Sequence, residues 1–258
     1  MAEPMVVVDD LHIVYRVYGA GGNKGTAATA LMRMLRRQNR PGLREVHAIR
    51  GISFVANRGD AVGIIGRNGS GKSTLLRAIA GLLPPEKGAV YTTGEASLLG
   101  VNAALLDDLT GERNVVLGCL AMGMSPQEVK RRYPDIVEFS GVGDFIDLPM
   151  RAYSSGMGSR LRFAIASAKS HDVLLIDEAL ATGDAPFRAK SHKRIEELRE
   201  EAGTVFLVAH NLSEVEETCN RIIWLERGEI IMDGDDVPGI IDAYLEASGG
   251  DRRTRQPV

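Results

Sequence analysis

The segment "GRNGSGKST", residues 66–74, constrains the fold of this 258-residue chain more than any other part. It follows a short apolar run at 61–65 that is typical of a buried strand, and it opens a segment with apolar residues at helical spacing. This context matches the G-x-x-x-x-G-K-[ST] phosphate loop (P-loop), whose glycines let backbone N–H groups approach phosphates. Lys72 would reach the β- and γ-phosphates, and the Ser73 hydroxyl would ligate Mg²⁺. The expected phosphate-binding residues are Gly66, Arg67, Asn68, Gly69, Ser70, Gly71, Lys72, Ser73 and Thr74.

A second strand-like run, "VLLIDE" at residues 173–178, ends in two acids. Beside a P-loop, Asp177 would hold Mg²⁺ through water, and Glu178 would polarise the water that attacks the γ-phosphate. Two acids at a strand end can also serve solvation alone, but the neighbouring P-loop favours the catalytic interpretation. Because strands alternate with helices around these motifs, the sequence predicts a mostly parallel sheet.

The segment "AYSSGMGSRLRFAIA", residues 152–166, predicts a second anion site. Its Ser/Gly cluster precedes a segment with apolar residues at helical spacing. Unpaired N–H groups and the positive end of the helix dipole converge at such a place. The chain thus carries two phosphate-binding segments, although a single nucleotide would need one.

These motifs, together with His210 after the strand-like "TVFLVA", resemble in kind and order those of an ATP-binding-cassette (ABC) ATPase. The resemblance covers roughly residues 6–234. It implies an α/β P-loop NTPase (RecA-like) core with an antiparallel β subdomain and an inserted helical subdomain, and it implies ATP and Mg²⁺ as cofactors. It also implies a homodimer paired head to tail, in which Ser154, Ser155 and Gly156 of one subunit clamp the γ-phosphate of ATP held by the other.

The same resemblance suggests roles for three further residues. His210 matches the switch histidine that contacts the γ-phosphate, so that Lys72, Glu178 and His210 form the expected catalytic set. Asp184 in "ATGD" matches the last position of the loop that crosses the dimer. Tyr15 fits the aromatic residue that stacks on adenine; Tyr18 is the alternative, and either could simply pack in a sheet.

Two departures from the family pattern stand out. The signature segment reads Tyr-Ser-Ser-Gly-Met instead of Leu-Ser-Gly-Gly-Gln. The coupling glutamine has no match either, because the chain has glutamine only at Gln38, Gln127 and Gln256; Gly100 or Asn102 is the nearest substitute. Coupling geometry at that point is therefore expected to differ.

Several segments, including "YSSGM", "DEALATGDAPFRAK" and "DLTGERN", resemble the ATPase of bacterial polysaccharide exporters. Such ATPases move lipid-linked O-antigen, teichoic acid or cell-wall galactan through separate membrane permease subunits, and overall likeness favours galactan. An exporter of a drug or other small molecule is the alternative function. A soluble ABC protein of translation or DNA repair is a third possibility, but it would need a second cassette or a long coiled coil. The carbohydrate-binding domain that some exporter ATPases carry is expected to be absent, since few residues follow Gly234.

Charge and hydropathy bear on the partners. The net charge of −3 argues against a nucleic-acid partner. Residues 19–50 nevertheless hold seven Lys or Arg and one acid, which would suit either anionic headgroups and the diphosphate of a lipid-linked glycan or a merely solvated loop. No apolar run is long enough to span a bilayer and no signal peptide is evident, so the expected location is the cytoplasmic face of the membrane, through the permease. Cys119 and Cys219 suggest neither a metal site nor a disulfide.

The expected organisation is an ABC ATPase domain at 1–245, with a basic insertion at about 19–47 and a helical subdomain at about 105–168, followed by a disordered tail at 246–258. The helix after the P-loop should run to about Leu83, before two prolines. Thr110 should cap a helix, while Ser125 with Glu128, and Ser213 with Glu216, should form capping boxes. Pro134 should kink or split its helix.

Overall fold

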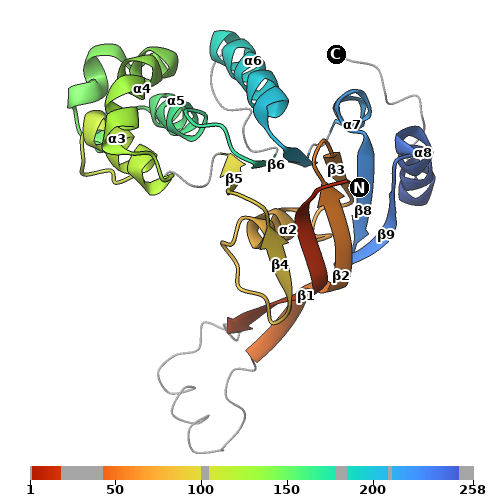
Figure 1. Ribbon diagram of the computed structural model, residues 1–258. Coiled ribbons are helices and arrows are strands. Elements are labelled where there is room, and N and C mark those ends of the chain that lie inside the picture. Colours follow the sequence, from red (N-terminus) through yellow and green to blue (C-terminus); the bar gives the residue numbers. More distant parts are fainter. Residues whose placement is uncertain (1, 19–42, 100–104, 178–184, 209–210, 250–258) are drawn as a thin grey trace, which may run out of the picture.

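The computed structural model describes residues 2–18, 43–99, 105–177, 185–208 and 211–249 (Figure 1). Its largest element is a six-stranded sheet in the order β5-β6-β7-β3-β8-β9. All neighbouring strands in it run parallel except β8 and β9, which form an antiparallel hairpin, so the predicted mostly parallel sheet is confirmed. The strands are β3 (Ala61–Ile65), β5 (Ala96–Leu99), β6 (Val173–Asp177), β7 (Thr204–Val208), β8 (Arg221–Glu226) and β9 (Glu229–Gly234).

This sheet is buried on both faces, as β6 illustrates. Val173 and Leu175 contribute to one apolar core, whereas Leu174 and Ile176 contribute to another. Successive side chains of a strand point to opposite faces, so a strand covered on both sides is apolar throughout. The second core also takes residues from α6 (Ala185–Glu201), α7 (Leu212–Thr218) and α8 (Val237–Ser248).

The other face of the sheet is covered by α2 (Lys72–Ile79) and by a three-stranded antiparallel sheet in the order β2-β1-β4. Leu75 and Leu76 of α2 are fully buried in the core that these elements share. The expected antiparallel β subdomain is therefore present. Its strands are β1 (Pro4–Tyr18), β2 (Leu43–Asn57) and β4 (Lys87–Thr92).

β1 and β2 form one long hairpin whose pairing runs from Pro4 with Asn57 to Tyr18 with Leu43. Residues 43–47, which the sequence assigned to the basic insertion, therefore belong to β2. Arg16 holds the hairpin end with ion pairs to Glu45 at 3.2 Å and to Glu86 at 2.7 Å. Residues 19–42, which contain most of the insertion, lie outside the described residues.

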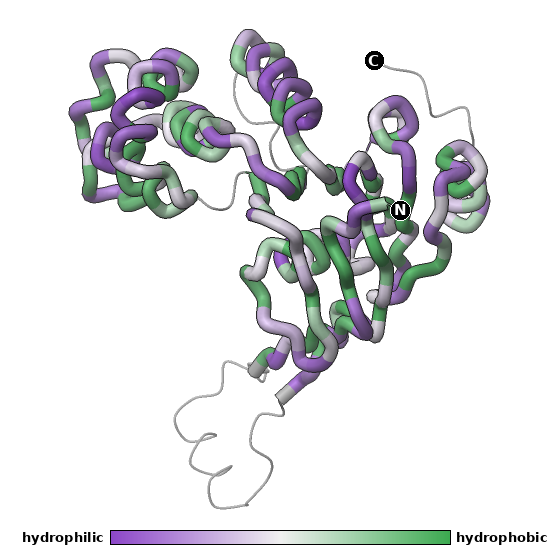
Figure 2. Tube along the Cα trace, viewed as in Figure 1, coloured by the Kyte–Doolittle hydropathy of each residue, from purple (hydrophilic) through white to green (hydrophobic). Residues whose placement is uncertain are grey.

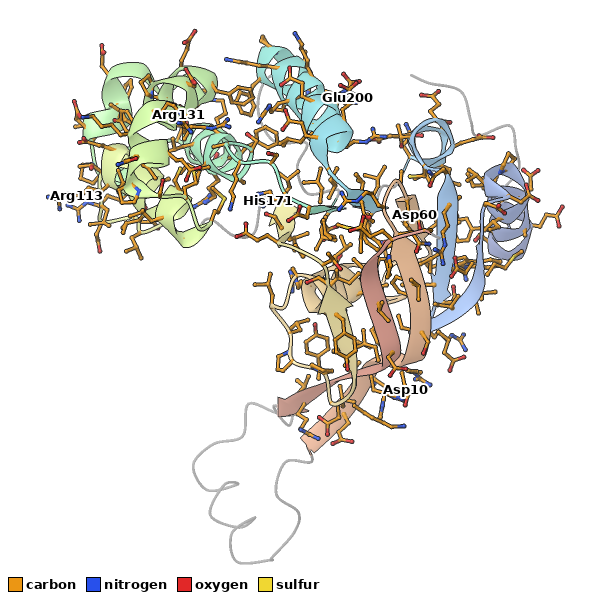
Figure 3. All side chains as sticks on the ribbon, viewed as in Figure 1. Asp10, Asp60, Arg113, Arg131, His171 and Glu200 are labelled. Carbon is orange, nitrogen blue, oxygen red and sulfur yellow. The ribbon has the colours of Figure 1, made fainter. Side chains whose placement is uncertain are left out.

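Between β5 and β6 the chain forms a separate group of helices, here called the helical body (Figure 1). It has an apolar core of its own, which includes Val115, Ile136 and Leu161. Figure 3 shows Arg113 and Arg131 pointing away from the sheets on this body. Its elements are α3 (Gly111–Ala121), α4 (Pro126–Ser140), the 3-10 turns η1 (Gly143–Asp147) and η2 (Met150–Ala152), and α5 (Ser155–Ala166).

Helix ends test the capping predictions. Thr110 caps α3, and Ser125 with Glu128 forms the expected capping box at α4. The predicted split at Pro134 is wrong, because α4 continues through it. The predicted box at Ser213 is also wrong: the side chain of Asn211 accepts from the Ser213 N–H, so the cap lies two residues before the expected one and α7 begins at Leu212.

Two other boundaries differ from expectation. α2 ends at Ile79 instead of Leu83, because the chain turns at Gly81, whose φ of 70° ends a right-handed helix. α8 continues to Ser248 and ends at Gly249, so residues 246–248, expected in a disordered tail, are helical. Residues 250–258 lie outside the described residues. Among the helices that the structure describes, none has the length and apolarity to cross a membrane.

Candidate nucleotide site

The P-loop connects the carboxyl end of β3 to the first turn of α2, as the motif requires. Gly66 has φ 147° and Gly71 has φ 111°, backbone conformations that side chains disfavour. A Cβ on Gly66 would collide with the carbonyl oxygen of Leu225, and one on Gly71 would lie 2.7 Å from that of Ala48. These two positions need glycine because other backbone segments close over the loop.

The loop leaves hydrogen-bond donors for a ligand. Gly71 caps α2 without a side-chain hydrogen bond, so the N–H groups of the first turn have no side chain of their own to satisfy them. Ser70 is 3% exposed, and its hydroxyl oxygen has no hydrogen-bond partner within the described residues. Ser70 does not line the pocket over the loop, so the N–H groups at the start of α2, beside Lys72, are the donors that suit a phosphate group.

Lys72 is held in the loop before any ligand binds. Its Nζ donates to the carbonyl oxygens of Gly66 at 2.7 Å and Arg67 at 3.1 Å. Burial lowers the pKa of Lys72, while the charges of Asp177 and Glu226 act in the opposite direction. The ammonium group is thus positioned in a partly desolvated site, where its attraction for an anion is stronger than in water.

A pocket of about 310 Å³ opens over the loop. Asp177 and Val208 enter it from the carboxyl ends of β6 and β7, where they are paired in the parallel register. The lining residues are Asn68, Gly69, Gly71, Lys72, Ser73, Thr74, Asp177 and Val208.

This donor set fits a nucleotide phosphate with Mg²⁺. An ammonium, backbone N–H groups and a hydroxyl face a carboxylate across one pocket. Among the residues described, no group of three or more His, Cys, Asp or Glu side chains could hold a metal. The Ser73 hydroxyl and the Asp177 carboxylate in this pocket would hold Mg²⁺ together with phosphate oxygens, as this ion prefers.

Tyr15 lies at the rim of this site. Its hydroxyl is 3.4 Å from Oγ1 of Thr74, the last residue of the P-loop segment. Val46 pairs with Tyr15 across the hairpin and is 43% exposed, so an apolar surface adjoins the ring. Tyr18 pairs with Leu43 at the far end of the hairpin. Tyr15 thus lies beside the P-loop, and it also packs against the core, as the alternative interpretation expected.

The second anion segment is built differently. Ser154 caps α5, and its hydroxyl accepts from the N–H of Met157 at 3.2 Å. Ser154 and Ser155 are exposed, and Gly156 is partly exposed. None of these three residues lines the pocket over the P-loop, so a single chain does not bring the two anion segments together.

Five further residues singled out by the sequence have no described position. Glu178, Asp184 and His210 lie outside the described residues, as do Gly100 and Asn102. Sequence reasoning missed Val208, although its place at the end of an apolar strand next to β6 could have indicated it. It also missed the Ala48 and Leu225 carbonyls that close over the loop, for which the sequence offers no signal.

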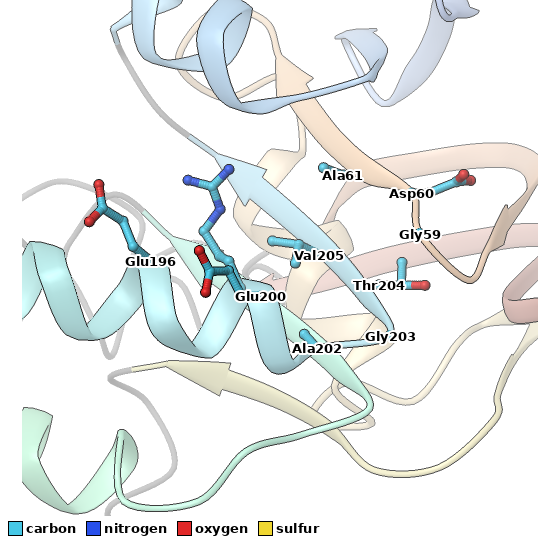
Figure 4. A pocket seen from close by; sticks show the side chains of 10 residues that line it. Gly59, Asp60, Ala61, Glu196, Glu200, Ala202, Gly203, Thr204 and Val205 are labelled. Carbon is cyan, nitrogen blue, oxygen red and sulfur yellow. The ribbon is translucent and has the colours of Figure 1, made fainter.

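A larger hollow of about 530 Å³ lies at the amino ends of β3 and β7, beside the end of α6 (Figure 4). Asp60, Glu196 and Glu200 line it, with Arg199 as its one basic residue. Parallel strands place loops that bind ligands at their carboxyl ends, and this hollow is at the opposite edge. Its mainly acidic lining also disfavours phosphate, so size alone would misidentify the nucleotide site.

Comparisons with known proteins agree with this geometry. The chain matches the sequence model of the ABC transporter family over residues 49–181. It is 43% identical over 205 residues to the O-antigen export system ATP-binding protein RfbB of Klebsiella pneumoniae, covering 79% of this chain and 83% of RfbB. It is 40% identical over 192 residues to the teichoic acids export ATP-binding protein TagH of Shouchella clausii, covering 74% of this chain and 53% of TagH.

Solved structures share the fold. A dimeric post-hydrolysis state of the ATP-binding cassette MJ0796, bound to ADP and Pi, superposes with a TM-score of 0.66 at 22% identity. The alignment covers 90% of this chain and 98% of that cassette. The P-loop pocket, the family match and the relatives agree, and the chain therefore belongs to the ABC transporter family as an ATP-binding subunit.

Proposed function

We propose that this ABC ATPase powers the export of a lipid-linked polysaccharide through separate membrane permease subunits. The observation that carries the ATPase part is the pocket in which Lys72 and the P-loop N–H groups face Asp177. The export part rests on relatives named for O-antigen and teichoic acids export, which are 43% and 40% identical to this chain. It agrees with the exporter-like segments around Ser154 and Asp184.

Within this function each residue has a defined task. Lys72 and the loop N–H groups bind the β- and γ-phosphates, Ser73 and Asp177 hold Mg²⁺, and Tyr15 stacks on the base. Bound Mg²⁺ would neutralise charge on the phosphate oxygens. Glu178 orients the attacking water, and His210 contacts the γ-phosphate.

The working unit that we propose is a head-to-tail homodimer. Ser154, Ser155 and Gly156 lie outside the pocket of their own chain, at the exposed start of α5. A second subunit would bring these groups over the P-loop, and its Asp184 would lie in the crossing between the subunits. ATP binding would then close the dimer, and hydrolysis would reopen it.

The proposed permease contact is on the helical body. Apolar side chains are exposed there, before and on α3 and in and directly after η1, where water would disfavour them in an isolated subunit. They are Leu106 (54% exposed), Leu117 (43%), Leu120 (39%), Phe145 (50%) and Leu148 (43%). Contact with a membrane subunit at this face would place the chain at the cytoplasmic face of the membrane.

The substrate can be tested by purification from membranes. Glu178→Gln should trap the ATP-bound complex, and lipid extracts of that complex should contain a sugar-bearing lipid detectable by mass spectrometry. Lys72→Ala is the matched control, since it should not trap the ATP-bound state. A trapped complex that carries small apolar compounds and no glycan would instead support the drug-exporter alternative.

A further inference from the structure

The first half of α6 is attached to the helical body through one side of the helix. Phe187, Lys190 and Arg194 are spaced by three and four residues, so they share a face. The Phe187 ring lies edge-on to Phe139 of α4 and Phe163 of α5, at centroid distances of 5.7 and 5.9 Å. Phe139 and Phe163 stack on each other at 5.9 Å. We call Phe139, Phe163 and Phe187 the aromatic clasp.

Polar contacts extend this attachment along the next two turns of α6. Lys190 Nζ lies 4.6 Å from the centroid of the Phe139 ring, a cation–π geometry. Arg194 donates from Nε and Nη2 to the carbonyl oxygen of Ser167, directly after α5, at 3.1 and 2.9 Å. Three successive turns of α6 thus hold the helical body.

The second half of α6 belongs to the nucleotide-binding core instead. Leu198 is 1% exposed and packs in the core that contains Ile176 and Trp224. Phe163 and Phe187 are buried, yet they belong to none of the three apolar cores of the described residues. Figure 1 shows α6 standing between α4 and α5 on one side and α7 on the other. Phe139 packs against the helical body's core, so the clasp joins the start of α6 to that body.

This joint has a consequence for residues 178–184, whose two ends the structure defines. Asp177 ends β6 in the core, and Phe187, three residues after Asp184, is fixed to the helical body. The described residues on either side of 178–184 are thus fixed to different bodies. Ser154 starts α5, the helix that also provides Phe163 to the clasp.

We propose that Phe187 is a positioning residue, which transmits movement of α5, the helix that begins beside Ser154, to the start of α6. This inference rests on the proposed shared ATP site. Closely packed side chains leave little free space and transmit strain. A displacement of α5 therefore displaces the Phe187 ring, and with it the start of α6. Tyr15 and the P-loop lie outside the joint, and ATP affinity of the single subunit does not depend on it.

The test compares two truncations on the same helix. In the full chain, Phe187→Ala should lower the kcat of ATP hydrolysis at least tenfold and change KM and nucleotide affinity less than twofold. Phe187→Leu, which keeps most of the volume, should restore part of kcat. Leu198→Ala removes a buried apolar side chain from the core half of α6 and serves as the matched control. At a similar loss of Tm, it should keep kcat within about twofold of wild type.

A direct readout is the distance between the two bodies. Spin labels on Arg131→Cys in α4 (Figure 3) and Tyr91→Cys in β4, with Cys219 replaced by Ser, should give a broader distance distribution in Phe187→Ala than in Leu198→Ala. Equal kcat losses in the two variants, or an unchanged kcat in Phe187→Ala, would overturn the proposal. Failure of the proposed function itself would look different, because wild type would then show no ATP hydrolysis that Lys72→Ala abolishes.

Discussion

The two Ser/Gly segments of this chain have similar compositions and opposite surroundings. In the P-loop, Ser70 is 3% exposed and Lys72 is 9% exposed, and backbone carbonyls close over Gly66 and Gly71. At the start of α5, Ser154 and Ser155 are exposed. The nearest atom to a Cβ on Gly156 would be the hydroxyl oxygen of Ser154, 3.9 Å away.

The contrast in burial shows that a helix start with serine and glycine is not by itself a complete phosphate site. The P-loop is completed within one subunit by β2, β6 and β8, which supply Ala48, Asp177 and Leu225. The α5 segment has hydrogen-bond donors, but among the described residues none encloses a ligand there. We expect it to form half of a site that a second subunit completes.

The largest effect is expected on the ATP-bound dimer, in which the P-loop of one subunit would meet the α5 segment of the other. Glu178→Gln should lower kcat by about 10²- to 10⁴-fold, because the positioned base is lost, while ATP still binds. The slow variant should accumulate as an ATP-bound dimer in size-exclusion chromatography. Adding Ser154→Arg should abolish that dimer, since the long cation would occupy the place of the γ-phosphate. Turnover of Glu178→Gln at the wild-type rate would show that Glu178 is not the base.

Mixing two inactive variants tests sharing itself. Lys72→Ala damages only the P-loop half and Ser154→Arg only the α5 half, so each alone should be inactive. In an equal mixture half of the dimers are mixed, each with one intact site, and about a quarter of wild-type activity should return if sites act independently. No recovery, although the subunits exchange, would count against a shared site.

Glycine substitutions sharpen the comparison at the level of stability. Gly66→Ala should lower the free energy of unfolding by about 1–3 kcal/mol, because its φ of 147° and the Leu225 carbonyl both oppose a Cβ. Gly156→Ala should change it by less than about 0.5 kcal/mol. Urea denaturation without nucleotide would measure both.

Gly66→Ala and Gly156→Ala also distinguish an effect on the stability of the subunit from an effect on dimerisation. Although Gly156→Ala is harmless to the isolated subunit, it should weaken ATP-driven dimerisation, since an added methyl group would face the partner's ATP. Full dimerisation of Gly156→Ala would show that this glycine does not approach a ligand. A stability loss equal to that of Gly66→Ala would show that the α5 segment is as enclosed as the P-loop.

How much of this could be predicted from sequence depends on the range of the interactions. The P-loop, the acidic end of β6 and the caps at Thr110 and Ser125 depend on a few neighbouring residues, and local pattern predicted them. The alternation of strands with helices predicted the mostly parallel sheet, and the family resemblance supplied the antiparallel β subdomain. The Ala48 carbonyl over Gly71 and the clasp at Phe187 join segments far apart in the chain, and no local pattern encodes such contacts. The resemblance also supplied roles for Glu178 and His210, which still require the variants described above.

The boundary errors have equally physical causes. Pro134 was expected to kink or split α4, and it does not split it, because Val129 and Ile136 on either side are anchored in the helical body's core. Tertiary packing there outweighs the local cost of proline. At α7, Asn211 competes with Ser213 for the cap, and both residue types are good caps, so sequence alone could not choose.

The smallest effect is expected in the pH dependence of stability, and only for the P-loop, where Lys72 is buried. Because burial lowers the pKa of Lys72 in the folded protein, the charged form costs stability at neutral pH. That cost is fully present below the lowered pKa and disappears as pH rises toward the ordinary value for lysine. The difference in unfolding free energy between wild type and Lys72→Met should therefore shift in favour of wild type as pH rises. Ser154→Ala changes no titratable group, so its difference from wild type should stay constant across the same range. Urea titrations between neutral pH and the ordinary pKa of lysine would measure both differences. A constant difference for Lys72→Met would show that Lys72 is solvated well enough to keep the ordinary pKa of lysine.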